Sequence, residues 1–146
     1  MPRIERTAEV VWAGNVARGE GRLTGLTGAF TDLPFSLPSR VGDPNGKTSP
    51  EELLAAAHGG CLTMSVASEL AQAGTPPTRL DTTCRIVMDE LEGEGHQIVA
   101  SFVAVAVDAA GADDDAVAAA LERADAGCPF STLLRKAGAE VSVTRA

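Results

Sequence analysis

The chain has 146 residues, of which 45% are hydrophobic and 22% charged, as in an ordinary globular protein. This length predicts one domain over residues 1–146 with a sizeable core. The net charge of −8 argues against a nucleic-acid or anionic-membrane surface, because both need a basic patch. No stretch has transmembrane length and no apolar segment of a secretory signal is present, so we expect a cytoplasmic protein.

Three cysteines, Cys61, Cys84 and Cys128, are too few for a secreted disulfide scaffold. Each is therefore either a small buried residue or a chemically active one. We expect no metal site, because His58 and Cys61 could offer two ligands but no third is indicated. We also expect no cofactor, since the glycine-rich stretch 14–28 lacks the pattern of a phosphate-binding loop.

The first part of the chain predicts short strands joined by glycine-rich turns. Alternation of apolar residues indicates a strand over residues 4–13, and a second strand is expected over 22–27. Residues 34–40 are bounded by prolines and predict a short edge strand. Arg18 flanks the first turn, and Arg40 lies shortly before the next element, on a segment that could fold over it.

The strongest helix signal covers residues 50–73. Ser49 suits the N-cap, Pro50 the first helical position, and Glu52 the third, which together form a capping box. Gly74 is placed to end the helix in a left-handed conformation. This segment is the longest predicted element of the chain.

The middle of this helix has two unusual features. Residues 53–57 are apolar on consecutive positions, which predicts that protein surrounds the helix, with a sheet on one side and a second subunit on the other. Gly59 and Gly60 are costly in a helix interior, by about 1 kcal/mol each relative to alanine. We expect them to allow close approach of another backbone or a ligand beside Cys61; the alternative is a helix that merely tolerates them or kinks there.

The rest of the chain predicts two strands, two helices and a final strand, at residues 79–90, 97–107, 113–127, 129–136 and 139–145. The first two strands should form a hairpin, with Cys84 on the apolar face as a core residue. Cys128 falls at the N-cap of the second helix, where the helix dipole and free N–H groups favour a thiolate. The tally predicts an α+β domain built on antiparallel strands.

Spacing alone leaves open whether Cys61 and Cys128 are packed residues or reactive ones. The block S-P-E-E-L-L-A-A-A-H-G-G-C-L-T-M-S and the later A-G-C-P-F-S resemble the OsmC/Ohr family of thiol-dependent hydroperoxide reductases. The likeness covers most of the chain, and the A-A-A-H and S-R segments are closer to the OsmC branch.

The resemblance implies an intertwined homodimer, with a strongly curved antiparallel sheet wrapped around central helices and active sites at the interface. It implies a peroxidase of oxidative or osmotic stress defence, which uses an external thiol or dithiol reductant. Cys61 matches the peroxidatic cysteine, Cys128 the resolving one, and Glu51 the carboxylate of the P-E-x-L motif. Arg40 matches the active-site arginine of the OsmC branch, whereas Arg18 matches that of the Ohr branch. The apolar setting of Cys61 favours organic hydroperoxides over hydrogen peroxide.

Two other functions remain open from the residues. His58, one helical turn before Cys61, would suit a Cys-His acyl-transfer enzyme, although it fits packing better. A non-catalytic homologue with inert cysteines is the other alternative.

Glu51 lies ten residues before Cys61, or ~15 Å along an unbroken helix. Either the helix breaks at Gly59-Gly60, or Glu51 reaches the Cys61 of a partner subunit, which we favour.

Overall fold

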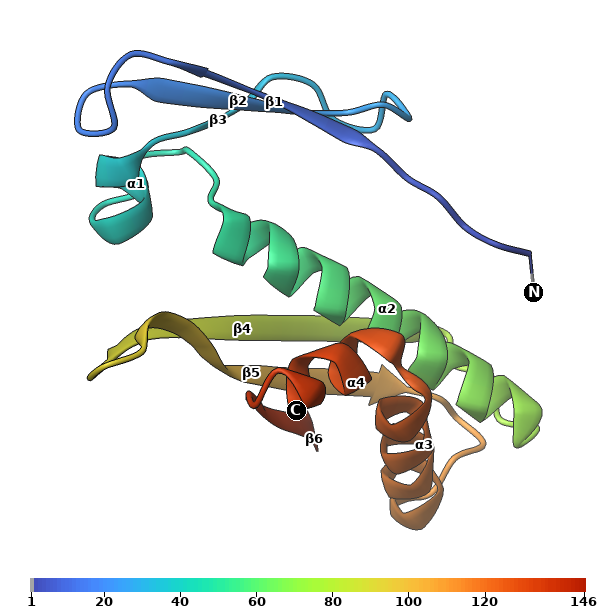
Figure 1. Cartoon of the computed structure of the whole chain (residues 1–146). Coiled ribbons are helices and arrows are strands. Elements are labelled where there is room, and N and C mark those ends of the chain that lie inside the picture. Colours follow the sequence, from blue (N-terminus) through green and yellow to red (C-terminus); the bar gives the residue numbers. More distant parts are fainter. Residues whose placement is uncertain (1) are drawn as a thin grey trace. The chain divides into compact units, whose positions relative to one another are not determined.

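The computed structural model describes residues 2–146. The chain divides into two compact units, one ending at Pro50 and one over residues 51–146, and each is described by itself (Figure 1). Strands and helices occur together, so the α+β class is confirmed. The expectation of a single domain over residues 1–146 stays a prediction. No helix within residues 2–146 has both the length and the apolar character needed to cross a bilayer.

The N-terminal unit is built on a three-stranded antiparallel sheet, in the order β1-β2-β3. Its strands are β1 (Ala8–Ala13), β2 (Glu20–Gly25) and β3 (Leu33–Phe35). The two strands predicted over 4–13 and 22–27 are present, but β1 starts later and β2 starts and ends earlier.

The edge strand predicted over residues 34–40 is wrong beyond its first two residues. Strand β3 ends at Phe35, and a short helix, α1 (Leu37–Val41), follows. The reason is local, because the side chain of Ser36 accepts a hydrogen bond from the N–H of Ser39, whose own side chain bonds back to the N–H of Ser36. This capping box stabilises the first turn, where a proline is also tolerated. As a result, Arg40 lies in the last turn of a helix rather than on a strand.

The second unit contains the long helix α2 (Pro50–Gln72), which confirms the helix predicted over residues 50–73. It ends before Gly74, whose φ of +80° is the left-handed conformation expected there. The helix runs unbroken through Gly59 and Gly60, so the predicted alternative of a break at this point is wrong. A Cβ at Gly59 would lie 3.1 Å from the Cβ of Cys84, and one at Gly60 would meet nothing within 4 Å. A close approach therefore exists at Gly59, but the neighbour is the side chain of Cys84 and not the backbone or ligand that was predicted.

A second three-stranded sheet has the order β4-β5-β6. Strands β4 (Arg79–Leu91) and β5 (Gly95–Asp108) form the predicted antiparallel hairpin. Strand β6 (Glu140–Arg145) pairs with β5 in parallel, which the sequence did not predict. The connection explains this pairing, because the helices α3 (Asp114–Gly127) and α4 (Pro129–Lys136) form a crossover of the length that parallel strands need.

The core of the second unit lies where α2 and α3 meet the inner face of β5. Its members are buried apolar side chains and one thiol: Leu62, Val66, Leu70, Val103, Val105, Val117, Ala120, Leu121, Ala124 and Cys128. Cys61 and Cys84 are partly buried and pack against this cluster. The core therefore brings all three cysteines to the same region of the second unit.

Candidate functional site

The structure brings Cys61 and Cys128 together, although they lie far apart in the sequence. Cys61 is half-buried on α2, whereas Cys128 is fully buried at the N-cap of α4. The two side chains are close enough that the Cys128 thiol raises the pKa of Cys61, and both cysteines are free thiols. Two thiols in contact have the arrangement from which a disulfide can form.

The N-terminus of α4 faces Cys61. The backbone N–H of Phe130 and the hydroxyl of Ser65 lie near the Cys61 thiol and lower its pKa, and the Ser65 hydroxyl itself donates to the backbone carbonyl of Cys61 at 3.1 Å. Burial acts more strongly in the other direction, followed by the neighbouring Cys128 thiol, so the pKa of Cys61 is raised overall. Cys128 makes no side-chain capping bond, although the sequence predicted that this helix start would favour its own thiolate. The N–H groups at the start of α4 therefore act on the Cys61 thiol.

His58 is fully buried and bonded on both sides of its ring. Nδ1 lies 2.7 Å from the Oγ of Ser101 on β5, and Nε2 lies 2.8 Å from the Oγ of Ser131 on α4. In a neutral imidazole one nitrogen donates and the other accepts, so one of the two serine hydroxyls accepts a hydrogen bond from the ring and the other donates one to it. Burial lowers the pKa of His58 and favours this neutral form. Because its ring nitrogens are bonded to serines, His58 is not arranged as a general base for Cys61.

Cys84 belongs to the same buried group rather than to the thiol pair. Its sulfur lies 3.4 Å from the Oγ of Ser101 and 3.9 Å from Nδ1 of His58. It is half-buried against the core, as predicted. It also lines an open hollow of about 450 Å³ beside the glycines of α2, together with Glu52, Ala55, Ala56, Gly59, Gly60, Thr63 and Thr82.

The two candidate arginines lie in the N-terminal unit, and both are exposed. Arg40 borders an apolar pocket of about 230 Å³. The other lining residues are Trp12, Val16, Phe35, Ser36 and Leu37. Arg18 lies in the turn after β1, where its backbone N–H bonds to the side chain of Asn15, and it does not line this pocket. Of the two candidate arginines, Arg40 is therefore the one that lines this apolar pocket.

Glu51 lies in the first turn of α2, on the same continuous helix as Cys61. Ten residues of helix separate their Cα atoms by ~15 Å, which is beyond the reach of a glutamate side chain. The structure thus does not bring Glu51 to the Cys61 of its own chain.

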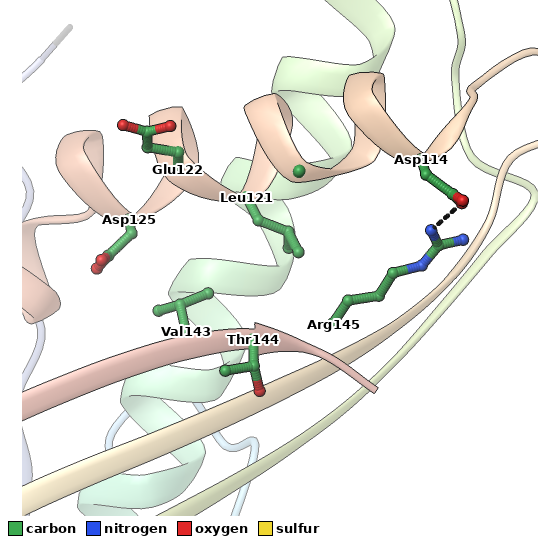
Figure 2. A pocket seen from close by; sticks show the side chains of 8 residues that line it. Asp114, Leu121, Glu122, Asp125, Val143, Thr144 and Arg145 are labelled. Carbon is green, nitrogen blue, oxygen red and sulfur yellow. Dashed lines mark hydrogen bonds and ion pairs between the residues drawn. The ribbon is translucent and has the colours of Figure 1, made fainter.

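A further hollow lies between α3 and β6 (Figure 2) and has a volume of about 440 Å³. It is lined by the carboxylates of Asp114, Glu122 and Asp125, and Asp114 forms an ion pair of 2.6 Å with Arg145. No thiol or imidazole lines it. Within residues 2–146 no group of three or more His, Cys, Asp or Glu side chains is placed to hold a metal ion.

Sequence reasoning did not find the serines or the amide of Phe130. One signal was present, because Ser131 follows Cys128 by three residues and His58 precedes Cys61 by three. Residues three apart share a helix face, so two helices that meet at the cysteines also meet at His58 and Ser131. Ser65 and Ser101 carried no comparable pattern.

Comparison with known proteins identifies the family. Residues 42–144 match the family described as OsmC-like protein. The chain is 31% identical over 132 residues to Peroxiredoxin OsmC of Escherichia coli K12, covering 90% of this chain and 91% of the relative, and it matches the Shigella flexneri protein of the same name equally well.

Solved structures show the same fold. The OhrB organic hydroperoxide resistance protein of Bacillus subtilis superimposes with a TM-score of 0.74 at 20% identity, covering 96% of this chain and 98% of that one. An OsmC organic hydroperoxide resistance protein from Legionella pneumophila gives a TM-score of 0.72 at 19% identity, covering 99% of both chains. With the family match and the 31% identical relative, these findings show that the chain belongs to the OsmC-like family.

Proposed function

We propose that this protein is a thiol-dependent peroxidase that reduces organic hydroperoxides with Cys61 and Cys128. The observation that carries the proposal is the contact between the two thiols at the N-terminus of α4. The family assignment and the name of the 31% identical relative, Peroxiredoxin OsmC, support it. A cytoplasmic location and a role in stress defence stay predictions.

The bonds that form and break involve only the peroxide and the thiols. The Cys61 thiolate attacks one peroxide oxygen, the O–O bond breaks, and the alkoxide leaves as an alcohol after taking up a proton. Cys61 is then a sulfenic acid, and the Cys128 thiol displaces its hydroxyl as water and forms a Cys61–Cys128 disulfide. Two external thiols, or one dithiol, reduce this disulfide by exchange and are themselves oxidised to a disulfide.

A cation is needed to form the thiolate, because burial and the Cys128 thiol raise the pKa of Cys61. In this proposal Arg40 supplies it, since its guanidinium borders a pocket and carries a fixed charge. The same charge would stabilise the alkoxide that develops on the leaving oxygen. Glu51 would orient the guanidinium through a bidentate ion pair.

The active site is proposed to form between two copies of the chain. Because α2 is continuous, Glu51 does not reach the Cys61 of its own chain, and in this proposal the Glu51 of a partner completes the site. Several large apolar side chains are also exposed, including Val10 and Val11 on β1 and Met64 on α2, which is 76% exposed. Apolar surface of this kind is typical of an obligate interface. A homodimer with composite sites accounts for both observations.

Substrate preference is proposed to come from the pocket beside Arg40. Its aromatic and aliphatic walls can remove an alkyl or aryl group from water, which is worth about 25 cal/mol per Å² of apolar surface. Hydrogen peroxide has no such group and gains nothing from these walls. Organic hydroperoxides are therefore the expected substrates.

Anaerobic titration of the reduced protein with cumene hydroperoxide tests this function. One equivalent should consume two thiols per chain and yield one equivalent of cumyl alcohol, leaving one thiol per chain. A protein whose three thiols survive in excess hydroperoxide would be the non-catalytic homologue. An activated ester that acylates the protein and releases its alcohol leaving group in a burst, with no reaction toward peroxide, would indicate the acyl-transfer enzyme instead.

The arginine assignment has a matched control. Arg40→Gln should lower kcat/KM by about 10- to 100-fold, the size expected for one lost charge-assisted hydrogen bond. Arg18→Gln removes an equally exposed guanidinium and should leave kcat/KM within about twofold. The opposite result would assign the role to Arg18.

A further inference from the structure

A second contact links the helices that carry the two cysteines. His58 precedes Cys61 by three residues on α2, and Ser131 follows Cys128 by three residues on α4, so each lies on the same helix face as its cysteine. The Nε2 of His58 and the Oγ of Ser131 are 2.8 Å apart. The helices are therefore joined by two neighbouring pairs, one thiol–thiol and one imidazole–hydroxyl.

The histidine end of this contact is fixed. Its Nδ1 bonds to the Oγ of Ser101 on the central strand β5, at 2.7 Å. His58, Ser101 and Ser131 are all fully buried. No buried side-chain nitrogen or oxygen in the described part of the chain lacks a partner. Separating α4 from α2 would leave buried polar atoms unpaired, at about 1–3 kcal/mol each, so the contact resists displacement.

Other polar contacts of α4 hold it to different elements. Arg135 forms an ion pair with Asp125 of α3, and its guanidinium also bonds to the carbonyl of Val141 on β6 at 3.3 Å. Both partners lie on the side of α4 that faces α3 and β6, and the pair is partly exposed. These contacts position α4 relative to α3 and β6. They do not set its distance from α2.

Formation of a disulfide is sensitive to that distance. The two sulfurs must come to about 2.05 Å with a restricted torsion angle, and small shifts of either backbone store strain in the bond. A misplacement of about 1 Å can slow an intramolecular step by about 100-fold. A sulfenic acid that is not resolved in time is oxidised further by peroxide.

We propose that the hydrogen bond between His58 and Ser131 is a positioning contact that holds Cys128 against Cys61 and so controls formation of their disulfide. The role of this contact in peroxidase turnover rests on the proposed function. Its effect on the formation of the Cys61–Cys128 disulfide does not. It should govern the resolving step and leave the attack on peroxide unchanged, because neither residue bonds to the Cys61 sulfur.

Equilibration of the protein with a glutathione redox buffer tests the positioning without any peroxide. In this exchange glutathione disulfide is reduced to two glutathiones while Cys61 and Cys128 form their disulfide. Ser131→Ala should lower the equilibrium constant at least tenfold, which corresponds to a potential less negative by about 30 mV. The matched control is Ser101→Ala, which removes an equally buried hydroxyl from the other ring nitrogen. It should lower the constant less than Ser131→Ala does, with a similar loss of unfolding free energy, because His58 then loses its bond to β5 but keeps its bond to α4.

Two isosteric variants keep the test valid if Ser131→Ala does not fold. The side-chain amide of His58→Gln reaches the position of Nε2, whereas that of His58→Asn reaches only the position of Nδ1. The glutamine variant should therefore retain more of the wild-type constant than the asparagine variant. Equal effects of Ser131→Ala and Ser101→Ala, or no effect of Ser131→Ala, would overturn the proposal in favour of simple packing.

A single-turnover experiment then separates this proposal from the proposed function. With cumene hydroperoxide, Ser131→Ala should form the Cys61 sulfenic acid within about twofold of the wild-type rate. It should close the disulfide at least tenfold more slowly and accumulate sulfinic acid. A shift in the glutathione constant without any reaction of wild-type Cys61 toward peroxide would support the positioning contact and reject the peroxidase. Equal slowing of both steps would overturn the positioning role.

Discussion

The backbone N–H of Phe130, on helix α4, lies near the sulfur of Cys61, on helix α2, and lowers the pKa of this thiol. Phe130 occupies the second position of α4, where a backbone N–H has no partner within its own helix. A free N–H at a helix start is a good donor to an anion. The helix that carries the proposed resolving cysteine therefore also stabilises the thiolate of the proposed attacking cysteine.

The two cysteines should have separable roles. Cys61→Ser should abolish peroxide consumption, because it removes the nucleophile. Cys128→Ser should allow one turnover per chain and then accumulate Cys61 as sulfenic or sulfinic acid. Mass spectrometry of alkylated wild type after oxidation should find a Cys61–Cys128 disulfide and a free Cys84. A dominant disulfide that contains Cys84 would contradict the assignment.

The apolar pocket should discriminate between peroxides. We expect wild type to have a higher kcat/KM for cumene hydroperoxide than for hydrogen peroxide. Leu37→Ser shortens one wall of the pocket and should lower kcat/KM for cumene hydroperoxide by about tenfold. The free energy that corresponds to this loss is smaller than that of fully burying a leucine side chain. The same variant should react with hydrogen peroxide at nearly the wild-type rate. Parallel losses for both peroxides would show that the pocket does not bind the alkyl group.

Glu51 should act across the dimer interface. Glu51→Ala and Cys61→Ser homodimers are each expected to be inactive. After unfolding and refolding together, half of the chains should be in heterodimers, and each heterodimer should contain one site with an intact Cys61 and an intact Glu51. About one quarter of wild-type activity should then return. A mixture that stays inactive, although both variants are folded and dimeric, would reject the assignment of Glu51 to the partner.

His58 should make the stability of the protein depend on pH. Burial lowers its pKa in the folded chain, while the nearby Asp125 opposes and Arg135 adds to this shift. The unfolded chain therefore binds the proton first as the pH falls below the ordinary histidine value of about 6.5. The free energy of unfolding should fall with pH in this window, by at most about 1.4 kcal/mol per pH unit.

Urea unfolding at a series of pH values between about 5 and 6.5 measures this slope. His58→Gln cannot take up a proton and should flatten the dependence, even if it lowers stability at every pH. An unchanged slope in this variant would assign the pH dependence to other groups.

The elements whose signals are local could be predicted from the sequence. The limits of α2 follow from a proline at its start and a glycine after its end, and the β4–β5 hairpin follows from an alternating stretch and a largely apolar one on either side of a glycine-containing turn. The motifs around Cys61 and Cys128 identified the two thiols and the family. These features depend on residues close in the chain, so propensity and periodicity suffice to predict them.

Which side chains meet in the folded chain could not be predicted from local patterns. The parallel pairing of β6 depends on how two helices return the chain to the sheet, and the serines around His58 come from β5 and α4. The Phe130 amide has no side-chain identity that a sequence pattern could reveal. Contacts between distant segments are selected by packing of the whole core, because a buried polar group must find a partner wherever the fold provides one. The sequence thus identified the candidate thiols, and the fold determined what surrounds them.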